Sequence, residues 1–302
     1  MTILEKLQSG EVILSDGALG TILQAKGLQP GECPELWNVT HRKEVLDIAR
    51  SYFEAGSEIV TTNSFGGSVF KLSFYGLGDR VSELNQAAAE IVREAAGKER
   101  HVAGSIGPTG KMLLMGDVTE EEWYNAFRDQ AVALEKGGAD IIIVETMTAI
   151  DEASVAVRAA RENTSCTVIV TMTFSAMPDG EYRTMMGVSP QEMVTSMKVA
   201  GAHIVGSNCG NGIEEMTGVT KAIRAADKDI PLIIQANAGA PEYINGKTTF
   251  RESPEMMASF VPQLIKSGVN IIGGCCGTTP EHIRAFRRVC SEGRLHYSGD
   301  II

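Results

Sequence analysis

The fold is indicated most clearly by the stretch ADIIIV at residues 139–144, which leads into a segment of helical period at 151–160. The first part is a short, continuous, apolar run, as expected for a strand of a parallel sheet that is covered on both faces. Parallel strands need a crossover connection between them, and the helical segment supplies one. The pair therefore predicts a strand–helix unit of an α/β protein.

The same unit recurs from one end of the chain to the other. Apolar runs predict further strands at 12–14, 58–63, 101–106, 167–171, 202–206, 232–235 and 269–272. Helical periods predict helices at 43–55, 81–96, 120–135, 191–199, 213–226, 254–266 and 280–289. Ser or Thr caps mark several helix starts, as at Thr119 and Ser253, and glycines such as Gly56 and Gly201 mark several helix ends.

Eight such units favour one closed barrel over the other arrangements that the length permits. The 302 residues suffice for two domains of roughly 150 residues or for one α/β barrel of about 250 residues with extensions. Eight consecutive strand–helix pairs leave no room for a second domain, and they fit a closed barrel better than a doubly wound sheet. We therefore predict a single (β/α)8 TIM barrel domain over residues 1–302.

The composition narrows the class of function. The chain has 27 Lys and Arg against 38 Asp and Glu, a net charge of −11, and no basic cluster, which argues against a nucleic-acid or anionic-membrane partner. No apolar run approaches the ~20 residues that span a bilayer, and the first residues do not resemble a secretion signal, so we expect a cytoplasmic protein. Six cysteines, two of them adjacent, are too few for a disulfide scaffold and point to metal or redox chemistry.

Three of the cysteines directly follow predicted strands. In a (β/α)8 barrel the active site lies at the carboxyl ends of the strands. Cys209 follows the sixth strand, and Cys275 and Cys276 follow the eighth, so all three can converge over the barrel mouth. Three thiolates with an open fourth position describe a catalytic zinc site, whereas the alternative is a tight glycine-rich turn with small buried thiols. We expect structural roles for the other three cysteines and for the five histidines.

Two acidic residues also lie at predicted strand ends. Glu145 directly continues an apolar strand, where a carboxylate needs a partner or a ligand, and a substrate ammonium would serve. Asp16 precedes a glycine, so it is either a binding group or a turn former. The glycine-rich loop at 104–110 matches neither a P-loop nor a dinucleotide fingerprint.

The motifs at these strand ends resemble those of the zinc-dependent homocysteine S-methyltransferase family, most closely the homocysteine-binding module of cobalamin-dependent methionine synthases. The likeness runs from about residue 12 to residue 289. The matching motifs, in order, are DGALGT (16–21), TNSFG (62–66), GSIGPTG (104–110), NC (208–209) and GGCCGTTP (273–280). Departures occur near the expected substrate: Ala236 replaces the usual proline, and a Gly-Asn-Gly segment follows Cys209.

The resemblance implies a role for each of these side chains. Cys209, Cys275 and Cys276 would bind zinc, and Asp16 and Glu145 would hold the amino group of homocysteine. Asn237, in a match to the family's Pro-Asn-Ala-Gly loop, would help to shape the same pocket.

The implied activity is zinc-dependent transfer of a methyl group to homocysteine, which gives methionine. Three thiolates leave the zinc site at −1, so a fourth, substrate thiolate stays ionised and nucleophilic. The barrel uses the whole chain, and no Asp-x-His-x-x-Gly cobalamin signature occurs. We therefore expect a methyl-corrinoid protein or a small methyl donor to arrive separately, with cobalamin carried only by that corrinoid partner.

Two other functions are compatible with the same residues. The chain could be the methyltransferase component of a corrinoid-dependent demethylase system, which moves a methyl group from a methoxy, methylthio or methylamino compound to a corrinoid protein. It could also be a metal-binding regulatory barrel without catalysis. The sequence leaves the oligomeric state open.

Overall fold

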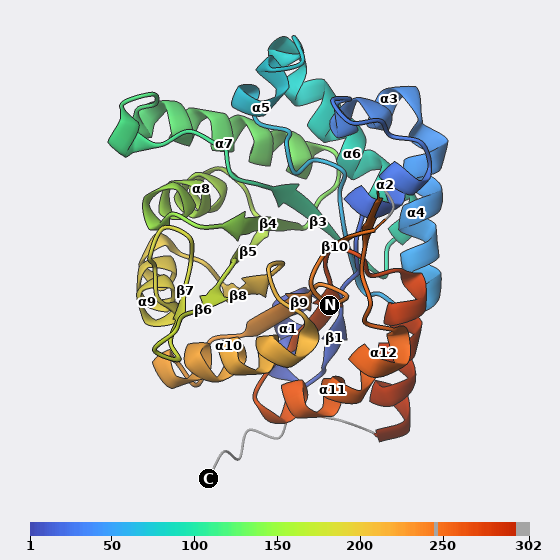
Figure 1. The fold of residues 1–302 in the computed structure, drawn as a ribbon. Coiled ribbons are helices and arrows are strands. Elements are labelled where there is room, and N and C mark those ends of the chain that lie inside the picture. Colours follow the sequence, from blue (N-terminus) through green and yellow to red (C-terminus); the bar gives the residue numbers. More distant parts are fainter. Residues whose placement is uncertain (245–246, 294–302) are drawn as a thin grey trace.

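The computed structural model describes residues 1–244 and 247–293 of the chain. Eight parallel strands form one sheet in the order β1-β12-β9-β8-β5-β4-β3-β2 (Figure 1). Their bounds are β1 (Ile13–Leu14), β2 (Ile59–Thr61), β3 (His101–Ile106), β4 (Ile141–Met147), β5 (Thr167–Met172), β8 (Ile204–Asn208), β9 (Leu232–Ala236) and β12 (Ile271–Gly274). A parallel bridge between Ser15 and Ile59 joins the first strand to the second and closes the barrel. The predicted (β/α)8 TIM barrel is confirmed.

A long helix follows each barrel strand and packs on its outside (Figure 1). These helices are α4 (Arg42–Ala55), α6 (Val81–Ala96), α7 (Glu120–Lys136), α8 (Ile150–Asn163), α9 (Pro190–Ala200), α10 (Ile213–Ala226), α11 (Pro254–Lys266) and α12 (Pro280–Gly293). Each covers a predicted helix, with longer C-terminal ends in α8 and α12. Strands β8 and β12 begin and end two residues later than predicted. Their last residues, Asn208 and Gly274, still pair with β9, although neither is apolar.

The barrel interior is apolar at one end and polar at the other. Isoleucines such as Ile141, Ile169 and Ile233 fill the lower layer, because alternate residues of a strand share one face. The short helix α1 (Ile3–Gln8), which the sequence analysis did not predict, packs Ile3 and Leu7 against this layer (Figure 1). Two residues further along the strands the interior side chains are polar: Ser15, Thr61, Ser105, Thr171 and Gln235. The functional groups therefore lie at the carboxyl ends of the strands.

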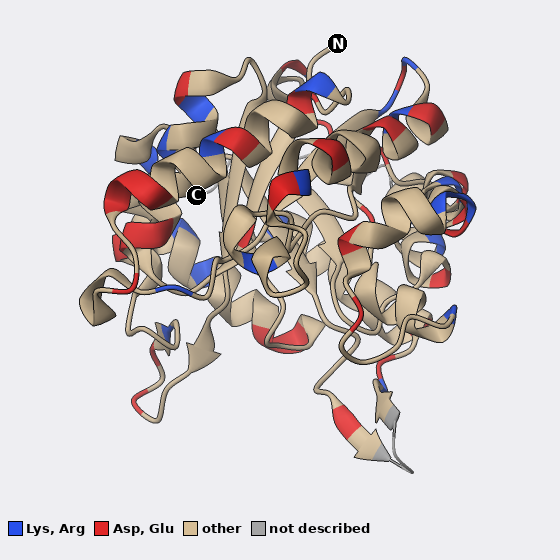
Figure 2. Ribbon diagram, turned by 90° about the horizontal axis from the view of Figure 1, so that it is seen from above, with Lys and Arg blue, Asp and Glu red and all other residues tan. Residues whose placement is uncertain are grey.

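The connections that leave these carboxyl ends contain further short elements. These elements were not predicted from the sequence. They are α2 (Gly20–Ala25), η1 (Pro34–Leu36), α3 (Trp37–Thr40), α5 (Val69–Ser73), η2 (Gly78–Arg80), η3 (Leu113–Met115), and the hairpins β6 (Ser175–Ala176) with β7 (Tyr182–Arg183) and β10 (Glu242–Ile244) with β11 (Lys247–Thr249). Figure 2 shows hairpins at the end of the molecule opposite the N-terminus, and acidic and basic residues interspersed over the outer helices. Within the described residues, no helix is long and apolar enough to cross a membrane.

Candidate metal and substrate site

Three cysteine sulfurs meet at the carboxyl end of the barrel. Cys209 follows β8, and Cys275 and Cys276 follow β12, with β9 between these two strands in the sheet. The three Sγ atoms lie within 4.8 Å of one another, and the Sγ atoms of Cys209 and Cys276 are 3.9 Å apart. Among the described residues, this is the one group of three or more His, Cys, Asp or Glu side chains with a metal-binding spacing. All six cysteines are free thiols.

The three thiols form a hydrogen-bonded cluster that favours a single negative charge. Hydrogen bonds from Cys275 and Cys276 lower the pKa of Cys209 far below that of an ordinary thiol. Cys275 and Cys276 are the donors in these hydrogen bonds. The bonds raise the pKa of both thiols, because the Cys209 sulfur holds each proton in place. A cation is therefore needed before all three sulfurs ionise together.

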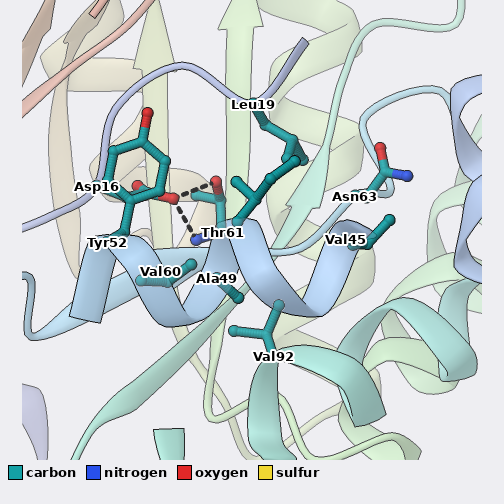
Figure 3. A pocket seen from close by; sticks show the side chains of 10 residues that line it. Asp16, Leu19, Val45, Ala49, Tyr52, Val60, Thr61, Asn63 and Val92 are labelled. Carbon is teal, nitrogen blue, oxygen red and sulfur yellow. Dashed lines mark hydrogen bonds between the residues drawn. The ribbon is translucent and has the colours of Figure 1, made fainter. Parts of the chain in front are cut away.

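Asp16 is buried beside this cluster. One of its carboxylate oxygens accepts hydrogen bonds, and the other has no partner among the described residues. Its Oδ2 accepts hydrogen bonds from the backbone N–H of Thr61 (2.7 Å) and from Thr61 Oγ1 (2.8 Å), as Figure 3 shows. Its Oδ1 is buried and has no hydrogen-bond partner among the described residues. Burial raises the pKa of Asp16 from 3.8 to about 6, against the effect of the Thr61 hydrogen bonds. A buried acceptor of this kind calls for a positively charged or hydrogen-bonding partner.

A small cavity adjoins Asp16 and lies between β2 and α4. Apolar side chains such as Val45, Ala49 and Val92 line most of it, and Tyr52 and Thr61 add polar groups (Figure 3). The Tyr52 hydroxyl donates to the carbonyl of Ala18, 2.7 Å away, and so fixes the loop after Asp16. The cavity volume is about 10 Å³, which is room for no more than one water molecule.

Glu145 lies in β4 across the mouth from β1. Its Oε1 accepts a short hydrogen bond from Ser105 Oγ. Part of the side chain faces the mouth, but protein atoms surround the carboxylate closely, and this loss of hydration raises the pKa of Glu145 from 4.5 to about 7. The negative charges of Asp16 and of Cys209 act in the same direction. The two carboxylates and the thiols are thus electrostatically coupled and share one site.

Asn237, the residue directly after β9, borders the thiol cluster. Its side-chain amide hydrogen-bonds Cys209 and contributes to the lowered pKa of that thiol. Its Oδ1 is buried without a hydrogen-bond partner among the residues that the structure describes. Its backbone N–H donates to the carbonyl of Asn211, 3.0 Å away, so the segment after Cys209 folds back over the end of β9. The structure thereby places all six predicted site residues around one barrel mouth.

Two residues of this mouth have a strained backbone. In the described part of the chain, Thr146 (φ 62°) and Cys209 (φ 60°) are the residues other than glycine with a positive φ. Such a conformation costs about 1–3 kcal/mol and is concentrated at functional sites. For Thr146, which is β-branched, it is especially unfavourable. The pairing of β4 with β5 is irregular between Val144 and Met147, so Glu145 and Thr146 lie in a bulge.

Sequence reasoning missed Asn208, which precedes Cys209 in β8. The side chain is buried and contacts Glu145, Thr146 and Cys275. Its position directly before a candidate ligand, at the carboxyl end of a strand, was a signal that could have identified it. The same holds for Ser105, the hydrogen-bond donor to Glu145.

The remaining cysteines and the histidines lie elsewhere. Cys166 is buried before β5 and donates to the carbonyl of Ala139, and Cys33 donates to Glu35 in the first loop. His203 Nδ1 accepts a hydrogen bond from the backbone N–H of Val168. These contacts fit the predicted structural roles.

Large apolar side chains are exposed on the loops around the mouth. They are Phe65, Phe74, Tyr75, Met112, Leu114, Met115, Met177, Met185, Met186 and Tyr243. They come from the connections after β2, β3, β5 and β9. Single exposed apolar side chains are common, but ten of them on connections that leave the carboxyl ends of the strands are consistent with an interaction surface on this side of the barrel.

Comparisons with known proteins agree with this arrangement. The family model of homocysteine S-methyltransferase matches residues 13–290. Methionine synthase of Mycobacterium tuberculosis is 32% identical over an alignment of 291 positions, which covers 91% of this chain and 24% of that protein. Methionine synthase of Mycobacterium leprae is 30% identical over an alignment of 302 positions, which covers 94% of this chain and 25% of that protein. The chain therefore spans about a quarter of the length of these curated relatives.

Solved structures show the same fold. The metallated form of the homocysteine methyltransferase MmuM from Escherichia coli has a TM-score of 0.75 and 22% sequence identity, over 93% of this chain and 97% of that one. Its oxidized form has a TM-score of 0.74 at 23% identity, with the same coverage of both chains. Because the family model covers nearly the whole barrel, the chain belongs to the homocysteine S-methyltransferase family.

Proposed function

We propose that the chain is a zinc-dependent methyltransferase that places a methyl group on the sulfur of homocysteine and forms methionine. One observation carries this proposal: three cysteine sulfurs share a barrel mouth with two carboxylates, and Asp16 Oδ1 is buried there with no partner in the part of the chain that the structure describes. A small molecule with a thiol at one end and an ammonium at the other matches both halves of the site, the thiol at the cysteines and the ammonium at the carboxylates. Homocysteine has this chemistry, and membership of the family favours it.

The three cysteines fit a zinc ion. Zinc with Zn–S bonds of about 2.3 Å in a tetrahedron separates its sulfurs by about 3.8 Å, and the 3.9 Å between the Sγ atoms of Cys209 and Cys276 agrees with this. Cys275 would supply the third sulfur ligand, and a substrate sulfur would complete the set of four ligands that zinc prefers. When bound, zinc supplies a Lewis acid that keeps a thiol ionised and nucleophilic at neutral pH.

Asp16 and Glu145 are proposed to hold the substrate ammonium. Both carboxylates are costly to ionise without a cation nearby, since burial raises both pKa values. An ammonium between them offsets this cost and favours their charged forms. Thr61 and Ser105 fix the two carboxylates by hydrogen bonds, so the bound amine is oriented. Holding the amine in place directs the sulfur toward the cysteines and lowers the entropic part of the barrier.

The methyl donor is proposed to come from outside the barrel. A methyl-corrinoid protein and a small donor such as S-methylmethionine are the two candidates. The apolar side chains on the mouth loops support a protein donor, because Met and aromatic residues are enriched in protein interfaces. Cobalamin then enters only through that partner. We also propose that residues 1–302 act as a single module, and that it works in the cytoplasm, where thiols remain reduced.

Methyl transfer by the purified protein tests the proposal. The protein is loaded with zinc, its metal content is measured, and homocysteine is added with methylcobalamin, S-methylmethionine, S-adenosylmethionine or a betaine in turn. We expect one zinc per chain and formation of methionine with at least one donor. Methyl transfer from a methoxy, methylthio or methylamino compound to a corrinoid, without methionine, would instead identify a demethylase component. Stoichiometric zinc without homocysteine binding would identify a regulatory metal barrel.

A further inference from the structure

Asn208 makes a set of contacts that joins the two halves of the mouth. Its Oδ1 accepts from the backbone N–H of Thr146 (2.9 Å) and from Thr171 Oγ1 (2.8 Å). Its Nδ2 donates to Thr146 Oγ1 (2.8 Å) and also faces Glu145 Oε2 (3.4 Å) and Cys275 Sγ (3.9 Å). One buried amide therefore touches the carboxylate half and the sulfur half of the site at once.

The two hydrogen bonds to Thr146 explain how its unfavourable backbone persists. A β-branched residue at φ 62° returns to an extended conformation unless its surroundings hold it. Asn208 contacts both the N–H and the hydroxyl of Thr146, so the amide resists rotation of this residue in either direction. Because Thr146 directly follows Glu145 in the bulge of β4, its conformation sets the direction of the Glu145 side chain.

We propose that Asn208 is a positioning residue that selects the substrate by length: through the strained bulge at Thr146 it fixes the gap between Glu145 and Cys275. The inference rests on the proposed function, in which the substrate amine is held at Glu145 and its sulfur is held at the cysteines. With the gap fixed, a thiol one methylene shorter than homocysteine cannot occupy both ends. Cysteine, which has the same amino and carboxyl groups, is the shorter analogue that the site must reject.

The expected preference for homocysteine over cysteine follows from the single methylene group by which the two ligands differ. A site that distinguishes two ligands by a single methylene typically does so by about 10- to 200-fold. We expect the zinc-loaded protein to prefer homocysteine over cysteine within this range. Without Asn208 the bulge relaxes, Glu145 follows whichever amine is present, and the preference falls toward unity.

Two substitutions of Thr146 provide the test while Asn208 stays in place. Thr146→Val and Thr146→Gly both remove the hydroxyl that accepts from Asn208 Nδ2. The valine variant keeps the strained φ of 62° but has lost one of the two hydrogen bonds with Asn208 that hold it there. The glycine variant adopts a positive φ without strain. If the strained bulge positions Glu145, the valine variant loses at least about 5-fold in its preference for homocysteine over cysteine, and the glycine variant stays within about 2-fold of the parent. If the hydroxyl has only a structural role, the two variants behave alike, which would overturn the proposal.

Asn208→Ala and the double variant Asn208→Ala/Thr146→Gly complete the experiment. Calorimetric binding of homocysteine and of cysteine, zinc content and circular dichroism are measured for each. We expect Asn208→Ala to keep its zinc and its fold but to lose about 10-fold or more in preference, and the double variant to recover part of it. Loss of zinc, or equal weakening of both ligands, would mean that Asn208 supports the fold or the metal instead. Failure of the parent protein to bind homocysteine would refute the proposed function, whereas normal binding with unchanged preference in Asn208→Ala refutes only this inference.

Discussion

Replacing Glu145 by glutamine should make the metal-free protein more stable. The same replacement should weaken the binding of homocysteine to the zinc-loaded protein. The pKa of this carboxyl is 4.5 in its ordinary state and about 7 in the folded protein, chiefly because of burial. The folded state therefore binds the proton more tightly than the unfolded state does. Stability falls as the pH rises from 4.5 toward 7, and it levels off above that range.

The size of the effect follows from the difference between the two pKa values. At about 1.4 kcal/mol per pH unit, the ionised carboxylate costs the folded state about 3 kcal/mol at pH 8, but only about 1 kcal/mol at pH 5. Glutamine has nearly the same shape and no charge, and its Oε1 still accepts from Ser105 Oγ. Its NH2 group then faces the Nδ2 donor of Asn208, which offsets part of the gain. Glu145→Gln should therefore raise the unfolding free energy by up to about 3 kcal/mol at pH 8, or roughly 5 °C in the melting midpoint for a chain of this length. The figure is an upper limit, because part of the side chain faces water at the mouth.

The assay compares parent and variant by urea and thermal unfolding after removal of metal with EDTA, at pH 5 and at pH 8. Glu54→Gln, an exposed substitution on α4, serves as the matched control and should change little at either pH. The same Glu145 variant should lose homocysteine affinity by at least about 30-fold in the zinc-loaded protein, since one half of a buried charge pair is missing. A variant less stable than the parent at pH 8, or a difference that does not grow with pH, would refute the reasoning.

Three further changes test the metal centre and the barrel. Cys209→Ser should lose stoichiometric zinc and methyl transfer but keep the circular dichroism of the parent. Cys290→Ser on α12 is the control and should keep all three properties. Metal analysis of both variants tests this, and full zinc in Cys209→Ser would contradict it. Gly206→Ala should prevent soluble folding, because its Cβ would lie 1.9 Å from the backbone carbonyl oxygen of Ile233; a normal yield of folded protein would contradict this. Leu7→Ala should lower the unfolding free energy by about 2–5 kcal/mol, measured in urea, since Leu7 on α1 is buried against the barrel interior; an unchanged midpoint would show that α1 contributes nothing to stability.

The positions of the barrel strands and outer helices were predictable because their signals are local. The apolar run at 139–144 and the cap at Ser253 act within a few residues of themselves, and the structure has β4 and α11 at these places. The predicted strand ends were less accurate. At Asn208 and Gly274, polar or small residues still pair with β9, and neither residue type favours a strand by itself.

The place of the candidate site was also contained in the sequence, once the fold was known. Parallel strands of a barrel bring all their carboxyl ends to one face, so residues as distant as Cys209 and Cys275 had to approach each other. The structure brings these sulfurs to metal-binding spacing, with Asp16 and Glu145 beside them. The roles proposed for these residues stay predictions until the assays above are made.

The sequence by itself determined the eight strand–helix units, the closed barrel and the face on which the functional groups gather, because periodicity, capping and strand order are properties of the chain. Only the tertiary structure decided the packing of α1 against the apolar end of the barrel, the oxygen of Asp16 that has no partner among the described residues, and the strained bulge held by Asn208. Each of these depends on contacts between residues that are far apart in the chain. Their energies arise from burial and from hydrogen-bond geometry, which exist only once the barrel has closed.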